Sequence, residues 1–300
     1  MIMAMKRINP KDTPLSKLHS YLVGAVAPRP IAFASTIDKE GNPNLAPFSF
    51  FNLFSGDPPV IIFSPARKGR DNTPKHTFEN ILENMEVVVN VVSYNMVEQA
   101  SLTSGEYPKG VNEFIKGGFT QVKSEMVKPF RVKESPVQLE CKVRQVIPLG
   151  KKAGAGNLVI AEIVLVHINE NVLDKDGNID PNAIDLVGRM GKDYYCRTSG
   201  NAVFEVAKPL SKPGMGIDRI PASIRDSNIL TGNNLGQLGS AETLPDETSV
   251  NEYKLLHLSE IFSAFSNNKN ELKKQLHIFA QQLLTNNKLE EAWKTLLAFN

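Results

Sequence analysis

The chain has 300 residues, of which 34 are Lys or Arg and 32 are Asp or Glu, and 41% of the residues are hydrophobic. This length and apolar content are typical of a globular protein with one large or two modest domains, and they exclude an intrinsically disordered chain. The formal net charge of +2 gives no reason to expect a nucleic acid or an anionic membrane surface as a partner.

The sequence shows no sign of export or of a metal centre. No apolar run approaches the length of a membrane span, and residues 1–12 lack the apolar stretch of a secretory signal, so we expect a cytoplasmic protein without a membrane partner. Cys141 and Cys196 lie far apart, and the five histidines show no short ligand spacing. A disulfide framework and a metal site are therefore not expected.

Residues 20–207 are rich in predicted strands. Runs of β-branched and aromatic residues, bounded by Gly, Pro, Asp and Asn, predict strands over 21–27, 30–37, 45–51, 59–64, 86–93, 137–149, 157–169 and 194–199. Residues 38–42 form the turn of one predicted hairpin. Residues 151–157 (KKAGAGN) contain glycines like those of a phosphate loop, but no helix follows them, so we interpret them as a second hairpin tip.

Few helices interrupt the strands. Residues 78–85 carry apolar side chains at helical spacing after Pro74, a favoured first-turn residue, and a second short helix is predicted over 96–102. Long strands with few crossover helices favour an antiparallel barrel over a doubly wound sheet.

The composition changes after residue 207. Residues 208–245 are rich in turn formers without a strong period, which predicts an extended segment docked on the rest of the chain. Residues 246–300 carry three amphipathic stripes separated by asparagine pairs, which predicts an α-helical C-terminal extension. The predicted domains are thus 15–207, 208–245 and 246–300. The extension either packs on itself or on the barrel, or it binds a partner.

A basic segment precedes the first predicted helix of the barrel. A helix N-terminus presents unpaired N–H groups and a partial positive charge, and arginine adds a planar fork that fits phosphate oxygens. A solvated basic loop with an ordinary helix cap would show the same pattern. The candidate phosphate-binding residues are Ser64, Arg67, Lys68, Arg70, Asp71, Asn72 and Thr73, of which the last three could also cap the helix.

Residues 44–51 (NLAPFSFF) place a proline inside a strand-like aromatic run. Such a proline belongs at a sheet edge or a bulge, where neighbouring backbone groups are free to face a ligand ring, and Ser49 adds a small hydroxyl. A barrel core with an edge strand is the alternative. The segment Pro28-Arg29-Pro30 similarly holds a cation in extended backbone at the start of a strand.

Several motifs in order resemble the flavin reductase-like family, the FMN-binding split barrels of flavoredoxin type. They are Arg29–Pro30 with Ala34-Ser35-Thr36, Asn44 to Phe50, Pro58–Pro59, Arg70 to Thr73, Asn80–Ile81, and the segments 134–143, 161–167 and 187–195. The resemblance covers roughly residues 15–207 and does not extend to 208–300. One departure is the turn Arg70 to Thr73 (RDNT), which has one residue more than the family's KDT pattern.

The resemblance implies a mainly β fold: an antiparallel split β-barrel that binds FMN, with a few short helices and the C-terminal α-helical extension. It implies that FMN accepts hydride from NADH or NADPH and that electrons pass to an acceptor, in a homodimer with the flavin near the subunit interface. Besides the basic residues, the carried-over FMN-binding residues are Arg29, Pro30, Ser35, Asn44, Ala46, Pro47, Ser49 and Phe50.

His167 has two interpretations. Period-two alternation places it on the same strand face as Leu165 and Ile163, which favours a structural histidine. The resemblance instead implies a catalytic position at the flavin or nicotinamide edge. Arg189, Tyr194 and Tyr195 are expected to close the site from the end of the barrel.

Two other functions stay open. The first is a non-enzymatic FMN-bound electron-transfer protein, similar to flavoredoxin, that is reduced by a redox partner protein. The second is a split barrel that has lost its flavin and works through its helical extension, although the basic segment argues against such a loss. No GxGxxG motif is present, but split barrels do not require one, so enzyme and carrier are not separated by the sequence.

Overall fold

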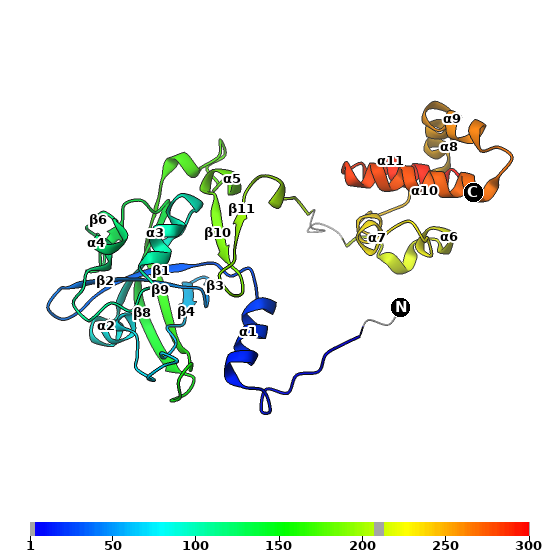
Figure 1. Ribbon diagram of the computed structural model, residues 1–300. Helices are drawn as coiled ribbons and strands as arrows, with labels where there is room; N and C mark the ends of the chain where they lie inside the picture. The colour runs from blue at the N-terminus through cyan, green and yellow to red at the C-terminus, as the bar shows by residue number, and fades with distance from the viewer. Residues whose placement is uncertain (1–3, 207–212, 300) are drawn as a thin grey trace. The chain divides into compact units, whose positions relative to one another are not determined.

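The computed structural model describes residues 4–206 and 213–299. The chain forms two compact units, one up to Phe204 and one from Glu205 onward (Figure 1). The predicted boundary at 207/208 lies outside the described residues. None of the described helices is both long and apolar enough to span a membrane.

A single antiparallel sheet of seven strands dominates the first unit, in the order β2-β1-β5-β8-β9-β4-β3. The strands are β1 (Ala32–Ile37), β2 (Pro43–Phe48), β3 (Phe51–Gly56), β4 (Pro59–Phe63), β5 (Glu86–Val91), β8 (Val137–Pro148) and β9 (Asn157–Ile168). The predicted hairpin turns are confirmed, because residues 38–42 connect β1 to β2 and residues 151–156 connect β8 to β9.

The sheet is curled into a barrel. The strands β2 and β3 lie at its two opposite edges, yet only Ser49 and Phe50 separate them in the chain. Two residues span at most about 7 Å, so the two edges must meet at that end of the sheet. The predicted antiparallel split barrel is thereby confirmed.

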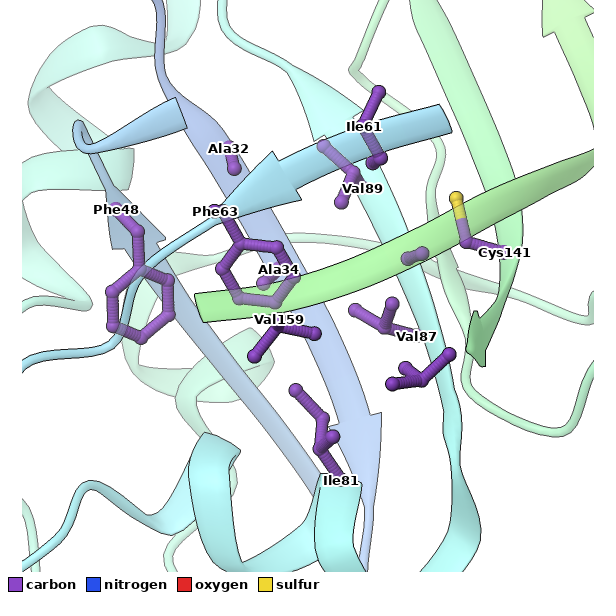
Figure 2. Packing of buried hydrophobic residues seen from close by; sticks show 12 residues of the cluster. Ala32, Ala34, Phe48, Ile61, Phe63, Ile81, Val87, Val89, Cys141 and Val159 are labelled. Carbon is purple, nitrogen blue, oxygen red and sulfur yellow. The ribbon is translucent and has the colours of Figure 1, made fainter. Parts of the chain in front are cut away.

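The barrel interior is one apolar cluster to which nearly every strand contributes (Figure 2). Ala32 and Ala34 of β1 pack with Phe63 of β4 and Val159 of β9, and all four are fully buried. Strands from both halves of the sheet share this cluster because their inward faces converge when the sheet closes. Cys141 belongs to it, and burial raises the pKa of its thiol far above the usual range.

A second apolar layer covers the outer face of β1 and β2. Phe33 and Leu45, both fully buried, point into it, where helices α3 (Val97–Leu102) and α4 (Glu113–Gly117) pack over them. This explains why β1 is buried at all six positions, unlike a strand with one solvated face. Two short hairpins complete the unit: β6 (Gln121–Val122) with β7 (Arg131–Val132), and β10 (Leu186–Arg189) with β11 (Tyr195–Thr198).

Three more helices belong to the first unit. They are α1 (Leu15–Ala25), α2 (His76–Asn84) and α5 (Pro181–Ile184). The strand predicted over 21–27 is wrong, because those residues continue α1. The apolar residues Leu15, Leu18 and Leu22 recur at helical spacing after Pro14, and this pattern prevails over the local β propensity of residues 21–23.

The second unit is helical and has its own core. Its helices are α6 (Ala222–Arg225), α7 (Gly232–Gly239), α8 (Glu247–His257), α9 (Ser259–Ala264), α10 (Lys269–Thr285) and α11 (Leu289–Leu297). Trp293 is 1% exposed and its Nε1–H donates to the carbonyl of Leu238 at 3.1 Å. The helical prediction for the end of the chain is confirmed over its described residues.

The described part of 208–245 is not extended throughout. Helix α7 begins with a capping box, in which the Thr231 hydroxyl accepts from the Asn234 N–H and the Asn234 side chain accepts from the Thr231 N–H. Leu238 of this helix is fully buried in the core of the second unit. The many turn-forming residues therefore indicate short helices and their caps rather than an extended docked segment.

Candidate functional site

A cavity of about 610 Å³ opens in the first unit where four segments meet, and we call it the main cavity. Its walls come from α1, the link between β2 and β3, residues 64–75, and the turn between β10 and β11. Its volume is within the range of about 300–1,000 Å³ that is typical of sites for small molecules.

Helix α1 supplies one wall with a single face. Ser16, His19, Ser20 and Val23 follow the i, i+3, i+4, i+7 spacing of a helix and all line the cavity. His19 lies edge-on to Phe50 with ring centroids 6.3 Å apart. Because the sequence predicts a strand over residues 21–27, it does not predict this helical wall. Only the helical spacing of residues 15–22 could have indicated it.

The edge strand β2 forms the floor. The Leu45 N–H donates to the Glu113 carboxylate at 3.1 Å, away from β1, so alternation turns position 47 to the same free edge. Pro47 stands there and has no N–H, and Ala46, Pro47 and Ser49 line the cavity. The predicted edge position of the proline is therefore confirmed, and burial raises the pKa of Glu113.

Arg29 connects the walls. Its guanidinium, 8% exposed, donates to the carbonyls of Val23 at 2.6 Å, of Val26, and of Met190 at 3.1 Å, and its Nε–H reaches the Ser49 hydroxyl at 3.4 Å. Burial, and secondly the charge of Arg189, lower the pKa of Arg29. With most of its donors already used, Arg29 acts mainly as a positioning residue for the cavity.

Residues 67–73 form a loop closed on itself. The Arg67 guanidinium donates to the Asn72 side chain at 2.8 Å and to its carbonyl, and Asn72 adopts a left-handed backbone with φ of 61°. Asp71 accepts from both the N–H and the hydroxyl of Thr73, which lowers the pKa of Asp71 to about 2. These contacts hold Arg67 and Lys68 at the cavity, whereas Asp71, Asn72 and Thr73 support the loop from outside the lining.

Helix α2 does not begin as predicted. Its N-cap is Lys75, no side chain caps it, and Asp71, Asn72 and Thr73 lie too early in the chain to do so. The first N–H groups of α2 therefore have no capping side chain, and Lys75 itself lines the main cavity. This is the geometry of an anion site at a helix N-terminus.

The main cavity is strongly cationic. Six of its lining residues are basic and one, Glu106, is acidic; the basic ones are Arg29, Arg67, Lys68, Lys75, Arg189 and Lys192. Arg70 does not line it and instead pairs with Glu106 at 2.9 Å, on the exposed surface. The excess of positive charge fits a ligand that carries phosphate.

The structure brings about half of the predicted cofactor-binding residues together. The predicted residues that line the main cavity are Arg29, Ala46, Pro47, Ser49, Phe50, Ser64, Arg67 and Lys68. Asn44 lies beside it in a small recess, donating to Thr77 at 2.8 Å. Pro30, Ser35 and Arg70 are not in the lining. Ser35 is fully buried on the outer face of β1, the face that also carries Phe33.

His167 lies elsewhere. Its Nε2 is 2.7 Å from Glu140 Oε1 and its Nδ1 is 3.9 Å from Glu125, and it does not line the main cavity. Glu140 is fully buried and also accepts from the N–H groups of Glu125, Met126 and Val127. The catalytic prediction for His167 is therefore not supported, and the structural interpretation describes its contacts.

Among the lining residues that the sequence did not single out are Ser16, His19, Lys75, Glu106 and Lys192. Lys75 and Lys192 are isolated lysines in loops, and nothing in their local pattern separates them from solvated surface lysines. Only the fold places them on one cavity.

A model of the flavin reductase-like domain matches residues 24–183. A protein of Aquifex aeolicus is 37% identical over 196 residues, which are 65% of this chain and 97% of that protein. The matched range of the domain ends before β10, so the β10–β11 hairpin lies beyond it.

Two solved structures are similar to the first unit. Nitrilotriacetate monooxygenase component B from Bacillus cereus is 30% identical with a TM-score of 0.64, and the match covers 68% of this chain and all of that one. A structure from Shewanella frigidimarina, described as a flavin reductase with a split barrel domain, is 28% identical with a TM-score of 0.56, covering 66% and 96%.

The Glu140 cluster predicts a pH-dependent contribution to stability. Glu140→Gln should lower the free energy of unfolding at pH 7 by about 2–4 kcal/mol, because a buried carboxylate with several donors is replaced by an amide that must turn its NH₂ toward one of them. Glu40→Gln, in the exposed β1–β2 turn, is the matched control. It should change the free energy of unfolding by less than about 0.5 kcal/mol.

Backbone donors and His167 outweigh burial and lower the pKa of Glu140 in the folded state. Its contribution is thus complete above the unfolded carboxyl pKa, near 4.5, and is lost as the pH falls below that value toward the folded pKa. In urea denaturation from pH 7 down to pH 3, the free energies of unfolding of the native protein and of Glu140→Gln should converge. A constant difference over this range would contradict the assignment.

Proposed function

Because the chain belongs to the flavin reductase-like family, we propose that it is an NADH- or NADPH-dependent FMN oxidoreductase whose flavin binds in the main cavity. In this proposal FMN takes hydride from the pyridine nucleotide and electrons pass to an acceptor. The observation that carries it is that the cationic loop, the N-cap residue Lys75 of α2 and the proline-interrupted edge strand all line one cavity. The comparisons support membership of this family, a flavin ligand and oxidoreductase chemistry.

The phosphate end of the proposed site is the start of α2. Lys68 and Lys75 extend from the closed loop and the N-cap, and neither makes an ion pair or side-chain hydrogen bond among the described residues. Ser64, 8% exposed, adds a hydroxyl at the base of the loop. Two free ammonium groups and unpaired N–H groups match the double negative charge of a phosphate monoester.

The ring end is the β2 edge. The backbone of residue 47 faces the free edge of β2, where its carbonyl has no ladder partner, and Ser49 supplies a hydroxyl that Arg29 already orients. Phe50, 42% exposed, offers an apolar face. When bound, FMN supplies the hydride-accepting chemistry, and the protein's part is to orient it and to limit solvent access.

The first test is FMN affinity, measured by quenching of flavin fluorescence. Lys68→Gln should weaken binding by about tenfold, because one charge-assisted hydrogen bond to phosphate is lost. Lys142→Gln is the control: it removes an exposed cation of β8 that does not line the main cavity, and it should change the affinity at most about twofold. Equal effects of both changes would contradict the placement of the phosphate.

The second test is reduction of the bound flavin. The protein with FMN is mixed anaerobically with NADH or NADPH and the loss of flavin absorbance near 450 nm is followed. Rapid bleaching by either nucleotide alone is expected. Bleaching only when a protein donor is added would instead identify an electron carrier that depends on a redox partner, and no bound FMN would overturn the proposal.

We also propose a homodimer that uses the free edge of β3. This strand ends the sheet, and Leu53 and Phe54 are 59% and 63% exposed on it, next to Phe50. An unpaired apolar edge strand exposes backbone donors and acceptors together with hydrophobic area, and a second copy of the chain satisfies both.

Sedimentation velocity tests the dimer. The native chain should sediment as a dimer, and the double change Leu53→Glu with Phe54→Glu should convert it to a folded monomer. Leu102→Glu, on α3 and 55% exposed, is the control and should leave the dimer intact. A monomeric native protein at micromolar concentration would exclude this interface.

A further inference from the structure

The cations of the main cavity exceed what one flavin phosphate requires. Lys68 lies in the closed loop and Lys75 is the N-cap of α2, but Arg189 and Lys192 also line the cavity and belong to the β10–β11 hairpin. Glu106 is the single acidic residue of the lining. Like charges around one cavity repel each other, so a second group of cations requires its own explanation.

The two groups of cations lie at different ends of the cavity. Lys68 and Lys75 also line a recess formed with α4 residues and Tyr107. Lys192 also lines a second recess, with Gly24, Tyr194 and Tyr195, that we call the hairpin recess. These two recesses share no residue with each other, whereas each shares several with the main cavity. The hairpin cations therefore form a subsite separate from the flavin phosphate end.

The hairpin turn is held firmly. Met190 donates its N–H to the Tyr194 carbonyl at 2.9 Å, and the Met190 carbonyl accepts from Arg29. Gly191 packs directly on the backbone of α1, because a Cβ built on Gly191 would lie 3.1 Å from the Cα of Gly24. A turn anchored from three directions presents its side chains in a fixed place.

Lys192 is placed at some conformational cost. Its φ is 54°, in the left-handed region that glycine and asparagine adopt more easily. Its side chain is exposed and makes no ion pair or hydrogen bond with any described residue. A strained, unpaired lysine at the mouth of a cavity is an observation that points to a ligand.

Aromatic side chains flank these cations. Tyr194 and Tyr195 are 69% and 38% exposed, and the Arg189 guanidinium lies 4.6 Å from the centre of the Tyr195 ring. Exposed tyrosines beside arginine form a platform on which a nucleobase can stack, and the adjacent ammonium binds phosphate.

We infer that the β10–β11 hairpin binds the adenosine phosphate part of the dinucleotide, with Lys192 on a phosphate and the exposed Tyr194 against the adenine. Arg189 donates to the Tyr194 carbonyl at 3.1 Å, lies 3.8 Å from Asp193 and covers the Tyr195 ring, so its part is to hold the hairpin in shape. This inference rests on the proposed function, since that function brings a pyridine dinucleotide to the cavity. The phosphate is either the pyrophosphate common to both nucleotides or the 2′-phosphate found only in NADPH.

The test measures binding as well as activity. AMP and adenosine 2′,5′-bisphosphate are titrated calorimetrically into the FMN-loaded protein and into Lys192→Asn, which removes the charge but keeps a residue suited to positive φ. The change should weaken binding of the recognised probe by about tenfold and leave FMN affinity as it was. Weakening of both probes indicates the pyrophosphate, and weakening of the bisphosphate alone indicates the 2′-phosphate.

The control is Lys175→Asn, in an exposed turn whose lysine lines neither the main cavity nor either of the two recesses. It should bind both probes like the native protein. Native-like binding by Lys192→Asn, or no binding of either probe to the native protein, would overturn the inference.

The kinetic arm separates this inference from the proposed function. Lys192→Asn should raise the KM for the nucleotide about tenfold with kcat little changed. If the probes bind as expected but neither nucleotide reduces the flavin, the hydride-transfer proposal fails and the nucleotide subsite stands. If NADH and NADPH reduce native protein and Lys192→Asn with the same KM, the function stands and the subsite fails.

Discussion

The buried guanidinium of Arg29 is the interaction on which the cavity depends. It is 8% exposed and binds carbonyls at the end of α1 and in the β10–β11 turn, while its backbone pairs with Arg189. A buried cation is tolerated only when its donors are satisfied, so α1 and the hairpin turn must both stay in place around it. Two segments separated by more than 160 residues are thus fixed as facing walls of one site. The buried charge thus fixes the geometry of the cavity that Arg29 also lines.

Barrel closure determines where the other side of the site lies. Because only Ser49 and Phe50 join the two edge strands, the edges come together at that point without pairing to each other, and backbone groups of β2 there lack ladder partners. Glu113 satisfies the outward N–H of Leu45 and proline removes the next one at 47. The polar groups that this edge presents to the cavity are therefore backbone carbonyls, which are acceptors, and the hydroxyl of Ser49. The split in the barrel and the binding site are therefore one feature of the topology.

The sequence predicted the long, β-branched strands that turn residues bound, but it did not predict the edge strand β3 or the short strand β10. It failed at 21–27, where β propensity and helical spacing conflict and only packing decides between them. The motif segment of β2 contributes Ala46 and Pro47 to the lining of the main cavity, but the loop after β4 does so only through its first half, and residues 70–73 lie outside the lining. Ser35 and His167 are motif residues whose strand positions turn them away from the main cavity. Lys75 and Lys192 could not be predicted, because only the fold brings isolated lysines to one cavity.

Charge links the site to the stability of the first unit. The charge of Arg189 already contributes to lowering the pKa of Arg29, which is the signature of cations that repel one another across a partly desolvated space. An anionic ligand replaces this repulsion by attraction and binds only the folded state, so its free energy of binding adds to the free energy of unfolding. The loop closed by Arg67 and Asn72 and the hairpin anchored by Arg29 hold the cations in place before the ligand arrives. Cations that are held in place in this way lower the stability of the free protein. They raise the affinity for an anion, because little has to move when the anion binds.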